Sequence, residues 1–242
     1  GYRKLTAKAP ITETLAAALI MLTPWKGDRI LVDPFCGSGT FPIEAAMMAA
    51  DIAPGLNRSF LAEQWTHLVP KKCWMDAAED ARYRIRNDIE TDIQGFDIDG
   101  DVIKSARENA KLAGVEKRCH FEVADVADFA AKQEAIVLTN PPYGERMSTI
   151  EGAAKLARTL GQQMEAHPCA GVYAITADMD FEHHYGKRAN KRRKMYNGMI
   201  PCQLYMYYNA PKFENRPAKP MPKSGFDGKR TQPGHTGRFE KK

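Results

Sequence analysis

The apolar positions along the chain predict short strands that alternate with helices. Runs of strand length lie at residues 29–35, 91–99, 119–125, 134–140 and 170–178. Helical patterns lie at residues 11–25, 39–53, 100–114 and 151–167. Pro24 ends the first helical pattern and Gly114 ends the third, and both residue types are common stop signals. Strands that alternate with helices in this way predict a parallel sheet with right-handed crossovers.

Two segments depart from this alternation. Asn197-Gly198 separates two strand-like runs within residues 192–208. An Asn-Gly pair at such a place is typical of a β-hairpin, so we expect the sheet to close with an antiparallel strand. Residues 51–91 interrupt the alternation, and we interpret them as an insertion that contains a helix at residues 76–90.

Length and composition bound the domain organisation. The 242 residues and the 43% hydrophobic content suit one α/β domain, predicted at residues 1–208. Residues 209–242 are rich in Pro, Gly and Lys and lack apolar periodicity, which predicts a disordered tail. The sequence has no run of about 18 apolar residues, so it predicts no membrane span.

The net charge of +5 is unevenly distributed. Residues 187–194 carry six basic residues and no acidic one, and residues 209–242 carry nine basic and three acidic residues. Residues 1–186 are therefore acidic overall. A local basic face favours a polyanionic partner, of which nucleic acid is the commonest, although a charge run can also be an ordinary solvated surface.

The cysteines and histidines indicate neither a disulfide framework nor a metal site. The five cysteines are odd in number and scattered, without a Cys-x-x-Cys pair. His183 and His184 are adjacent but have no companions at ligand spacing. This usage is typical of a reduced, cytoplasmic protein, and we predict no metal.

A glycine-rich turn follows the first strand in "DPFCGSGT", residues 33–40. Glycine lets the backbone approach a ligand closely at the start of a helix. A dinucleotide site fits poorly, because Pro42 replaces the third glycine of the Gly-x-Gly-x-x-Gly pattern and the next acidic strand end comes too late. The turn residues expected to contact a cofactor are Asp33, Pro34, Cys36, Gly37, Ser38, Gly39 and Thr40.

The order of the strand ends fits S-adenosylmethionine better. Asp97 and Ile98 end the second strand, Asp125 and Val126 follow the third, and Asn140 follows the fourth. Ligands of open α/β sheets bind at these carboxyl ends. Asp97 can accept hydrogen bonds from both ribose hydroxyls, and Asp125 can accept one from the adenine amine. Each Asp could instead serve as a helix N-cap.

Four sequence segments resemble a known family. They are "DPFCGSGTFPIE" (residues 33–44), "APGLNRSF" (53–60), "TNPPYGER" (139–146) and "KMYNGMI" (194–200). They resemble the THUMP-associated rRNA guanine-N2 methyltransferases, a family also labelled N6-adenine-specific DNA methylases. The resemblance covers most of residues 1–208 and implies an upstream THUMP RNA-binding domain.

With the resemblance, the fold prediction becomes specific. We expect an α/β fold of the class I (Rossmann-like) S-adenosylmethionine-dependent methyltransferase type. Its sheet should be mostly parallel and seven-stranded, with a C-terminal antiparallel hairpin.

The "NPPY" segment accounts for amine methylation. The Asn140 side-chain oxygen and the Pro141 carbonyl can accept the two N–H groups of an exocyclic amine and aim its lone pair at the methyl group. Pro141 and Pro142 fix φ and so preorganise these acceptors. Tyr143 offers a face on which an extruded base can stack. Because Tyr143 stands where carbon-5 methyltransferases carry a cysteine, we interpret Cys36 as a packing residue.

The resulting hypothesis is an RNA methyltransferase that acts on guanine N2 of 23S rRNA. An adenine-N6 methyltransferase acting on DNA or RNA stays open, because "NPPY" serves both amines, and so does a tRNA guanine-N2 methyltransferase. A non-catalytic RNA-binding module with a decayed methyltransferase fold is the alternative from another class. The intact turn and strand-end residues argue against that module.

Overall fold

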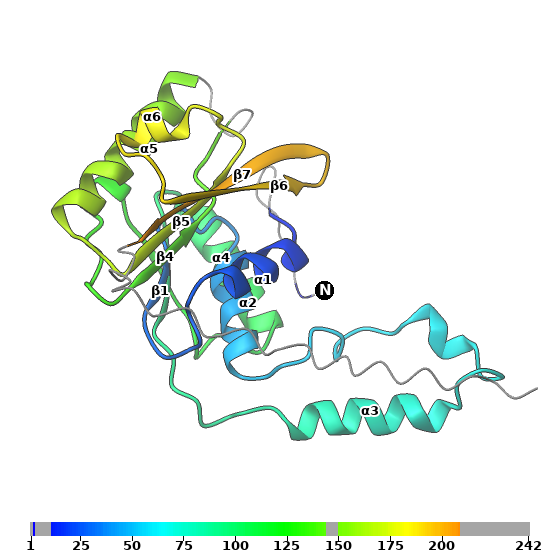
Figure 1. Cartoon of the computed structure of the whole chain (residues 1–242). Helices are drawn as coiled ribbons and strands as arrows, with labels where there is room; N and C mark the ends of the chain where they lie inside the picture. Colours follow the sequence, from blue (N-terminus) through cyan, green and yellow to red (C-terminus); the bar gives the residue numbers. More distant parts are fainter. Residues whose placement is uncertain (1, 3–10, 144–149, 209–242) are drawn as a thin grey trace, which may run out of the picture. The chain divides into compact units, whose positions relative to one another are not determined.

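The computed structural model describes residues 2, 11–143 and 150–208. These residues form one seven-stranded sheet with the strand order β3-β2-β1-β4-β5-β7-β6 (Figure 1). Gly1–Asn209 is one compact unit. The predicted tail at residues 209–242 lies outside the described residues, so its disorder stays a prediction.

Five parallel strands carry the centre and one side of the sheet. They are β1 (Leu31–Asp33), β2 (Ile93–Asp97), β3 (His120–Val123), β4 (Ile136–Thr139) and β5 (Gly171–Thr176). The hairpin strands β6 (Lys191–Asn197) and β7 (Ile200–Tyr208) are antiparallel to each other, and β7 is antiparallel to β5. The predicted mostly parallel sheet with a closing antiparallel hairpin is confirmed.

Helices cover both faces of the sheet (Figure 1). One face carries α1 (Glu13–Leu22), α2 (Thr40–Ala49) and α4 (Gly100–Leu112). The other carries α5 (Ile150–Ala166) and α6 (Phe181–Tyr185). Such two-sided covering explains why the strand sequences are apolar almost throughout rather than alternating.

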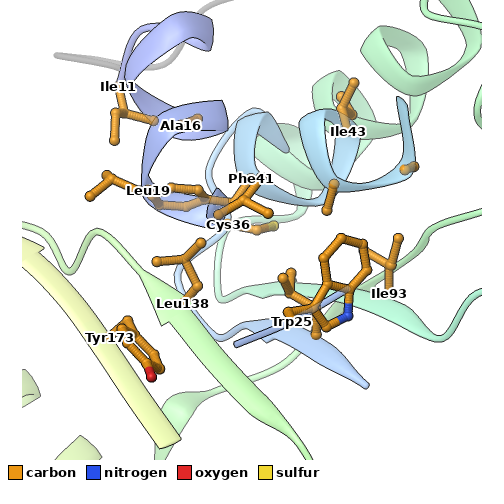
Figure 2. Close-up of a cluster of buried hydrophobic side chains, with 14 of the residues drawn as sticks. Ile11, Ala16, Leu19, Trp25, Cys36, Phe41, Ile43, Ile93, Leu138 and Tyr173 are labelled. Atoms are coloured by element: carbon orange, nitrogen blue, oxygen red, sulfur yellow. The ribbon is translucent and has the colours of Figure 1, made fainter. Parts of the chain in front are cut away.

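Two hydrophobic clusters, one on each face, hold these layers together. Along β4, Ile136 and Leu138 pack into the cluster with α1 and α2, whereas Val137 packs into the opposite one. This is the period-2 alternation of strand side chains. Figure 2 shows Leu138 and Cys36 together in the first cluster. β1 and β4, which also pair directly, therefore end side by side at one edge of the sheet.

The helix of the insertion begins and ends earlier in the chain than the sequence predicts. It is α3 (Lys71–Tyr83), whereas the sequence pattern predicts residues 76–90. Pro70 stands at its N-cap, and a proline is tolerated at a helix start because the first N–H groups need no intrahelical acceptor. No residue of α3 is buried, and a short 3-10 helix (Leu61–Gln64) precedes it. Because the helix has no buried face, no apolar pattern in the sequence marks its boundaries.

No helix in the described part of the chain is long and apolar enough to cross a membrane.

Candidate functional site

A cavity of about 530 Å³ opens at the carboxyl ends of the parallel strands. The predicted cofactor residues that line it are Asp33, Pro34, Cys36, Gly37, Ser38, Thr40, Asp97, Ile98, Asp125, Val126 and Asn140. Pro142 lines it too, whereas Gly39, Pro141 and Tyr143 are not among the lining residues. Residues from β1 and β2 and from the segments after β3 and β4 thus meet at one place.

The two glycines of the turn between β1 and α2 have different roles. Both have positive φ, 54° for Gly37 and 84° for Gly39, where side chains are rarely tolerated. A Cβ on Gly39 would lie 2.9 Å from the Phe121 ring, so Gly39 lets α2 pack closely. A Cβ on Gly37 would meet no atom within 4 Å. Gly37 lines the cavity and leaves room for a ligand beside the backbone.

Asp97, at the end of β2, is hydrogen-bonded to the turn that follows β1. Its Oδ2 accepts the N–H of Gly37 at 3.0 Å, and its Oδ1 accepts the N–H of Asp99 at 3.1 Å. Burial raises the pKa of Asp97 above its ordinary value, against the opposing effect of these backbone hydrogen bonds. Two carboxylate oxygens offer about four acceptor positions, so the group can still accept ligand hydroxyls.

The neighbouring Asp99 is a cap rather than a free carboxylate. Its side chain accepts the N–H groups of Asp101 and Val102 and so begins α4. Asp99 nevertheless lines the cavity. Asp97 and Asp99 both line the cavity and each accepts two backbone N–H groups, so the ribose contact of Asp97 stays a prediction.

Asp125 is the helix N-cap that the sequence left open as an alternative, and it also lies at the cavity. It is the N-cap of a 3-10 helix (Val126–Asp128), with Oδ1 accepting the N–H of Ala127 at 2.9 Å. It also lines the cavity together with Val126. Capping fixes the carboxylate beside the cavity, and its contact with the adenine amine stays a prediction.

Asp33 joins the cofactor turn to the segment that follows β4. The carboxyl group is almost fully buried, and its Oδ1 accepts the Thr139 hydroxyl at 2.6 Å and the N–H of Phe35 at 3.1 Å. Thr139 directly precedes Asn140. A buried carboxylate at the cavity wall favours a cationic ligand group. Sequence reasoning missed Thr139, because its contact spans 106 residues of chain.

The "NPPY" residues lie at the end of β4. Asn140 is buried and lines the cavity with Pro142. Tyr143 is only 8% exposed and packs in the hydrophobic cluster, with its hydroxyl 3.8 Å from the Cys202 Sγ. The ring therefore presents no open face here, and base stacking on Tyr143 stays a prediction. Residues 144–149, the remainder of this segment, lie outside the described residues.

Cys36 has the environment of a packing residue. It is buried in the cluster that also holds Phe41 and Leu138 (Figure 2). Burial, together with the nearby carboxylates of Asp33 and Asp97, raises the pKa of the Cys36 thiol well above its ordinary value. A thiol that resists ionisation is a poor nucleophile.

Other cavity residues gave little sequence signal. Ile11 before α1 and Leu156 on α5 reach the cavity only through the tertiary fold. Ile98 was expected, and at 69% exposure it is an apolar side chain held open at the cavity. Such a side chain suits the flat face of a heteroaromatic ring.

A family model matches residues 1–206. It describes the RMKL-like methyltransferase domain, UPF0020. The chain belongs to this family. The resemblance inferred from the sequence segments is thereby confirmed, and so is the class I methyltransferase fold.

Relatives of the chain include longer proteins. "Putative RNA methyltransferase YpsC" of Bacillus subtilis (strain 168) is 40% identical over 210 residues, which cover 86% of this chain and 54% of that protein. "Ribosomal RNA large subunit methyltransferase K/L" of Vibrio cholerae serotype O1 (strain ATCC 39315 / El Tor Inaba N16961) is 37% identical over 223 residues, 89% of this chain and 31% of that protein. The chain thus spans about half and about a third of these relatives.

A solved structure shows the same fold with a ligand. The crystal structure of "SMU.472, a putative methyltransferase complexed with SAH" has a TM-score of 0.81 and 39% sequence identity. The match covers 87% of this chain and 55% of that one.

Proposed function

We propose that this RMKL-like domain is an S-adenosylmethionine-dependent RNA methyltransferase that acts on guanine N2 of 23S rRNA. The observation that carries the proposal is the composition of one cavity. Asp33, Asp97 and Asp125 line it together with Asn140, so the expected cofactor residues and the expected amine acceptor meet in a single site.

The cavity suits the chemistry of S-adenosylmethionine. Gly37 leaves open space beside its backbone, and Asp97 offers acceptors at the adjacent strand end. Ile98 supplies an exposed apolar surface for adenine, and the capped Asp125 offers an acceptor for its amine. The buried Asp33 places negative charge at the wall, which favours a ligand bearing an amino or sulfonium cation.

The chain's own residues position the target amine. S-adenosylmethionine, when bound, supplies an activated methyl group. The Asn140 side-chain oxygen and the Pro141 carbonyl accept the two amine N–H groups, which turns the nitrogen lone pair away from them and toward the methyl donor. Pro141 and Pro142 restrict the backbone, so the acceptors need little reorganisation. The amine loses a proton after transfer, and no dedicated general base is required.

The substrate assignment is supported by the names of the relatives. The Vibrio cholerae relative is named a large-subunit rRNA methyltransferase, and the Bacillus subtilis relative an RNA methyltransferase. The excess of basic residues in the C-terminal part of the chain agrees with a polyanionic substrate. An upstream THUMP domain and a cytoplasmic place of action stay predictions that accompany this function.

Labelled methyl transfer tests the proposal. The chain is incubated with S-adenosylmethionine carrying a tritiated methyl group and with protein-free 23S rRNA, and the digested RNA is separated into nucleosides. N2-methylguanosine is the expected product, and Asn140→Ala is the inactive control. N6-methyladenosine as the sole product would transfer the assignment to adenine. Failure to bind S-adenosylmethionine in calorimetry would contradict the proposal that the chain is a methyltransferase.

A further inference from the structure

The strand β6 forms one edge of the sheet and pairs with β7 (Figure 1). Its first four residues, Lys191, Arg192, Arg193 and Lys194, are all basic and all exposed. Basic side chains on an edge strand can serve to prevent edge-to-edge aggregation. They can also bind a polyanion, and the placement of the individual side chains distinguishes these roles.

The four basic side chains divide between two faces. Arg193 stands directly opposite Leu204 of β7, and Leu204 packs in the cluster under α1 and α2. Directly opposed residues of antiparallel strands share a face. Lys191 lies on the same face as Arg193, because side chains alternate along a strand. Arg192 and Lys194 point to the opposite face, which α5 and α6 cover.

The two faces differ in counter-charge. On the α5 and α6 side, the Arg192 Nη1 lies 3.5 Å from the Glu182 Oε2, and the Lys194 Nζ lies 5.6 Å from the centre of the Tyr196 ring. Within the described residues, no carboxylate lies within 4 Å of the Lys191 or Arg193 side chain. The positive charges of Lys191 and Arg193 are therefore less compensated than those of Arg192 and Lys194.

The face with Lys191 and Arg193 leads to the "NPPY" segment. The Tyr143 hydroxyl lies 3.8 Å from the Cys202 Sγ on β7, and Cys202 stands directly opposite Met195 on β6. Arg193 is two residues from Met195 on the same face, roughly 7 Å along the strand. One continuous face of the hairpin thus connects the basic residues to the end of β4.

We propose that Lys191 and Arg193 bind backbone phosphates of the RNA strand that leads into the active site. This inference rests on the proposed function and adds the surface along which the substrate lies. Charge complementarity selects RNA as the occupant, and phosphate contacts position a strand without reading its bases. The neighbouring Arg192 and Lys194 contribute less, because Glu182 and the Tyr196 ring already engage them.

Two double variants with the same loss of charge test the proposal. Lys191→Gln with Arg193→Gln removes the pair on the "NPPY" face, and Arg192→Gln with Lys194→Gln removes the opposite pair. Binding to protein-free 23S rRNA is measured as a function of salt. A single-strand phosphate contact contributes about 0.7 to the slope of log K against log salt. The first variant should lower the slope magnitude by about 1.4, and the second by less than half of that.

Methylation kinetics and cofactor binding complete the test. The first variant should raise the KM for RNA at least about tenfold and leave kcat at saturating RNA within about twofold, with unchanged S-adenosylhomocysteine affinity in calorimetry. Equal effects of the two variants on RNA binding would overturn the proposal. An unchanged slope together with a loss of solubility would also overturn it and would show that the basic residues prevent edge-to-edge aggregation. If the wild-type chain binds S-adenosylhomocysteine but neither binds nor methylates RNA, the proposed function fails and this inference fails with it.

Discussion

Substitution of Asp97 tests the cofactor geometry most directly. The carboxylate joins the Gly37 and Asp99 backbone N–H groups, and we propose that it also accepts the ribose hydroxyls. Hydrogen bonds to charged groups contribute roughly 1.5–3 kcal/mol each. Asp97→Asn keeps the size of the side chain but replaces one acceptor oxygen by a donor. Loss of one such bond should therefore weaken S-adenosylmethionine binding at least about tenfold, measured by calorimetry.

A ligand lacking one hydroxyl separates a direct contact from a disturbed turn. Asp97→Asn also changes the acceptors for Gly37 and Asp99, so a weaker affinity alone does not prove contact with the ribose. The comparison therefore uses 5′-methylthioadenosine and its 2′-deoxy analogue against both proteins. If Asp97 holds the ribose, removal of the 2′-hydroxyl should cost less affinity in the variant than in the wild type.

One result of this comparison would refute the contact between Asp97 and the ribose. An equal loss of affinity in both proteins means that Asp97 and the hydroxyl do not interact, because the coupling term of the double-mutant cycle is then zero. The role of Asp97 would reduce to holding the Gly37 turn and the start of the segment at Asp99. Thermal unfolding of the variant is the control for a general loss of structure.

Three further predictions concern the cavity and the glycine turn beside it. Asn140→Ala should abolish methyl transfer while calorimetry still shows S-adenosylmethionine binding; near-normal turnover would refute its role as amine acceptor. Gly39→Ala should lower the free energy of unfolding by about 2–4 kcal/mol, because left-handed backbone strain and overpacking against Phe121 add. Gly37→Ala should lower it by only about 1–2 kcal/mol and should mainly weaken cofactor binding. Urea titrations measure the stability of both variants, and calorimetry measures their cofactor affinity. Burial raises the pKa of Asp97, so the folded protein keeps this proton to higher pH than the unfolded chain and loses that stabilisation as pH rises through the raised pKa. As pH rises above 3.8, the ordinary pKa of the Asp97 carboxyl, the wild type should therefore lose stability relative to Asp97→Asn. A stability difference that does not change with pH in urea unfolding would contradict this.

The sequence was sufficient for the parts of the fold that depend on local pattern. Strand ends followed by Asp97, Asp125 and Asn140 could be found because apolar runs mark buried parallel strands and their carboxyl ends meet at one edge. The hairpin at Asn197-Gly198 could be found because its turn type has a strong residue preference.

The sequence was insufficient where burial was not periodic or contacts were long-range. Helix α3 has no buried face, so its true start after Pro70 had no hydrophobic pattern to mark it. The five-residue α6 was missed, since a helix that short carries less than two turns of pattern. Burial of Tyr143 depends on Cys202, which lies 59 residues away in the chain and joins it only when β7 adds to the sheet.

The contact between Thr139 and Asp33 connects the two halves of the proposed chemistry. The Thr139 hydroxyl donates to a carboxylate that also fixes the start of the cofactor turn through the Phe35 N–H. The residue directly after β4 is Asn140, the proposed acceptor for the target amine. We expect a displacement of the turn to be transmitted to Asn140 through this buried, charge-assisted hydrogen bond, in addition to the direct pairing of β1 with β4. In-line transfer requires the methyl donor and the amine to be aligned, and we expect this bond to help hold the two proposed protein supports in register.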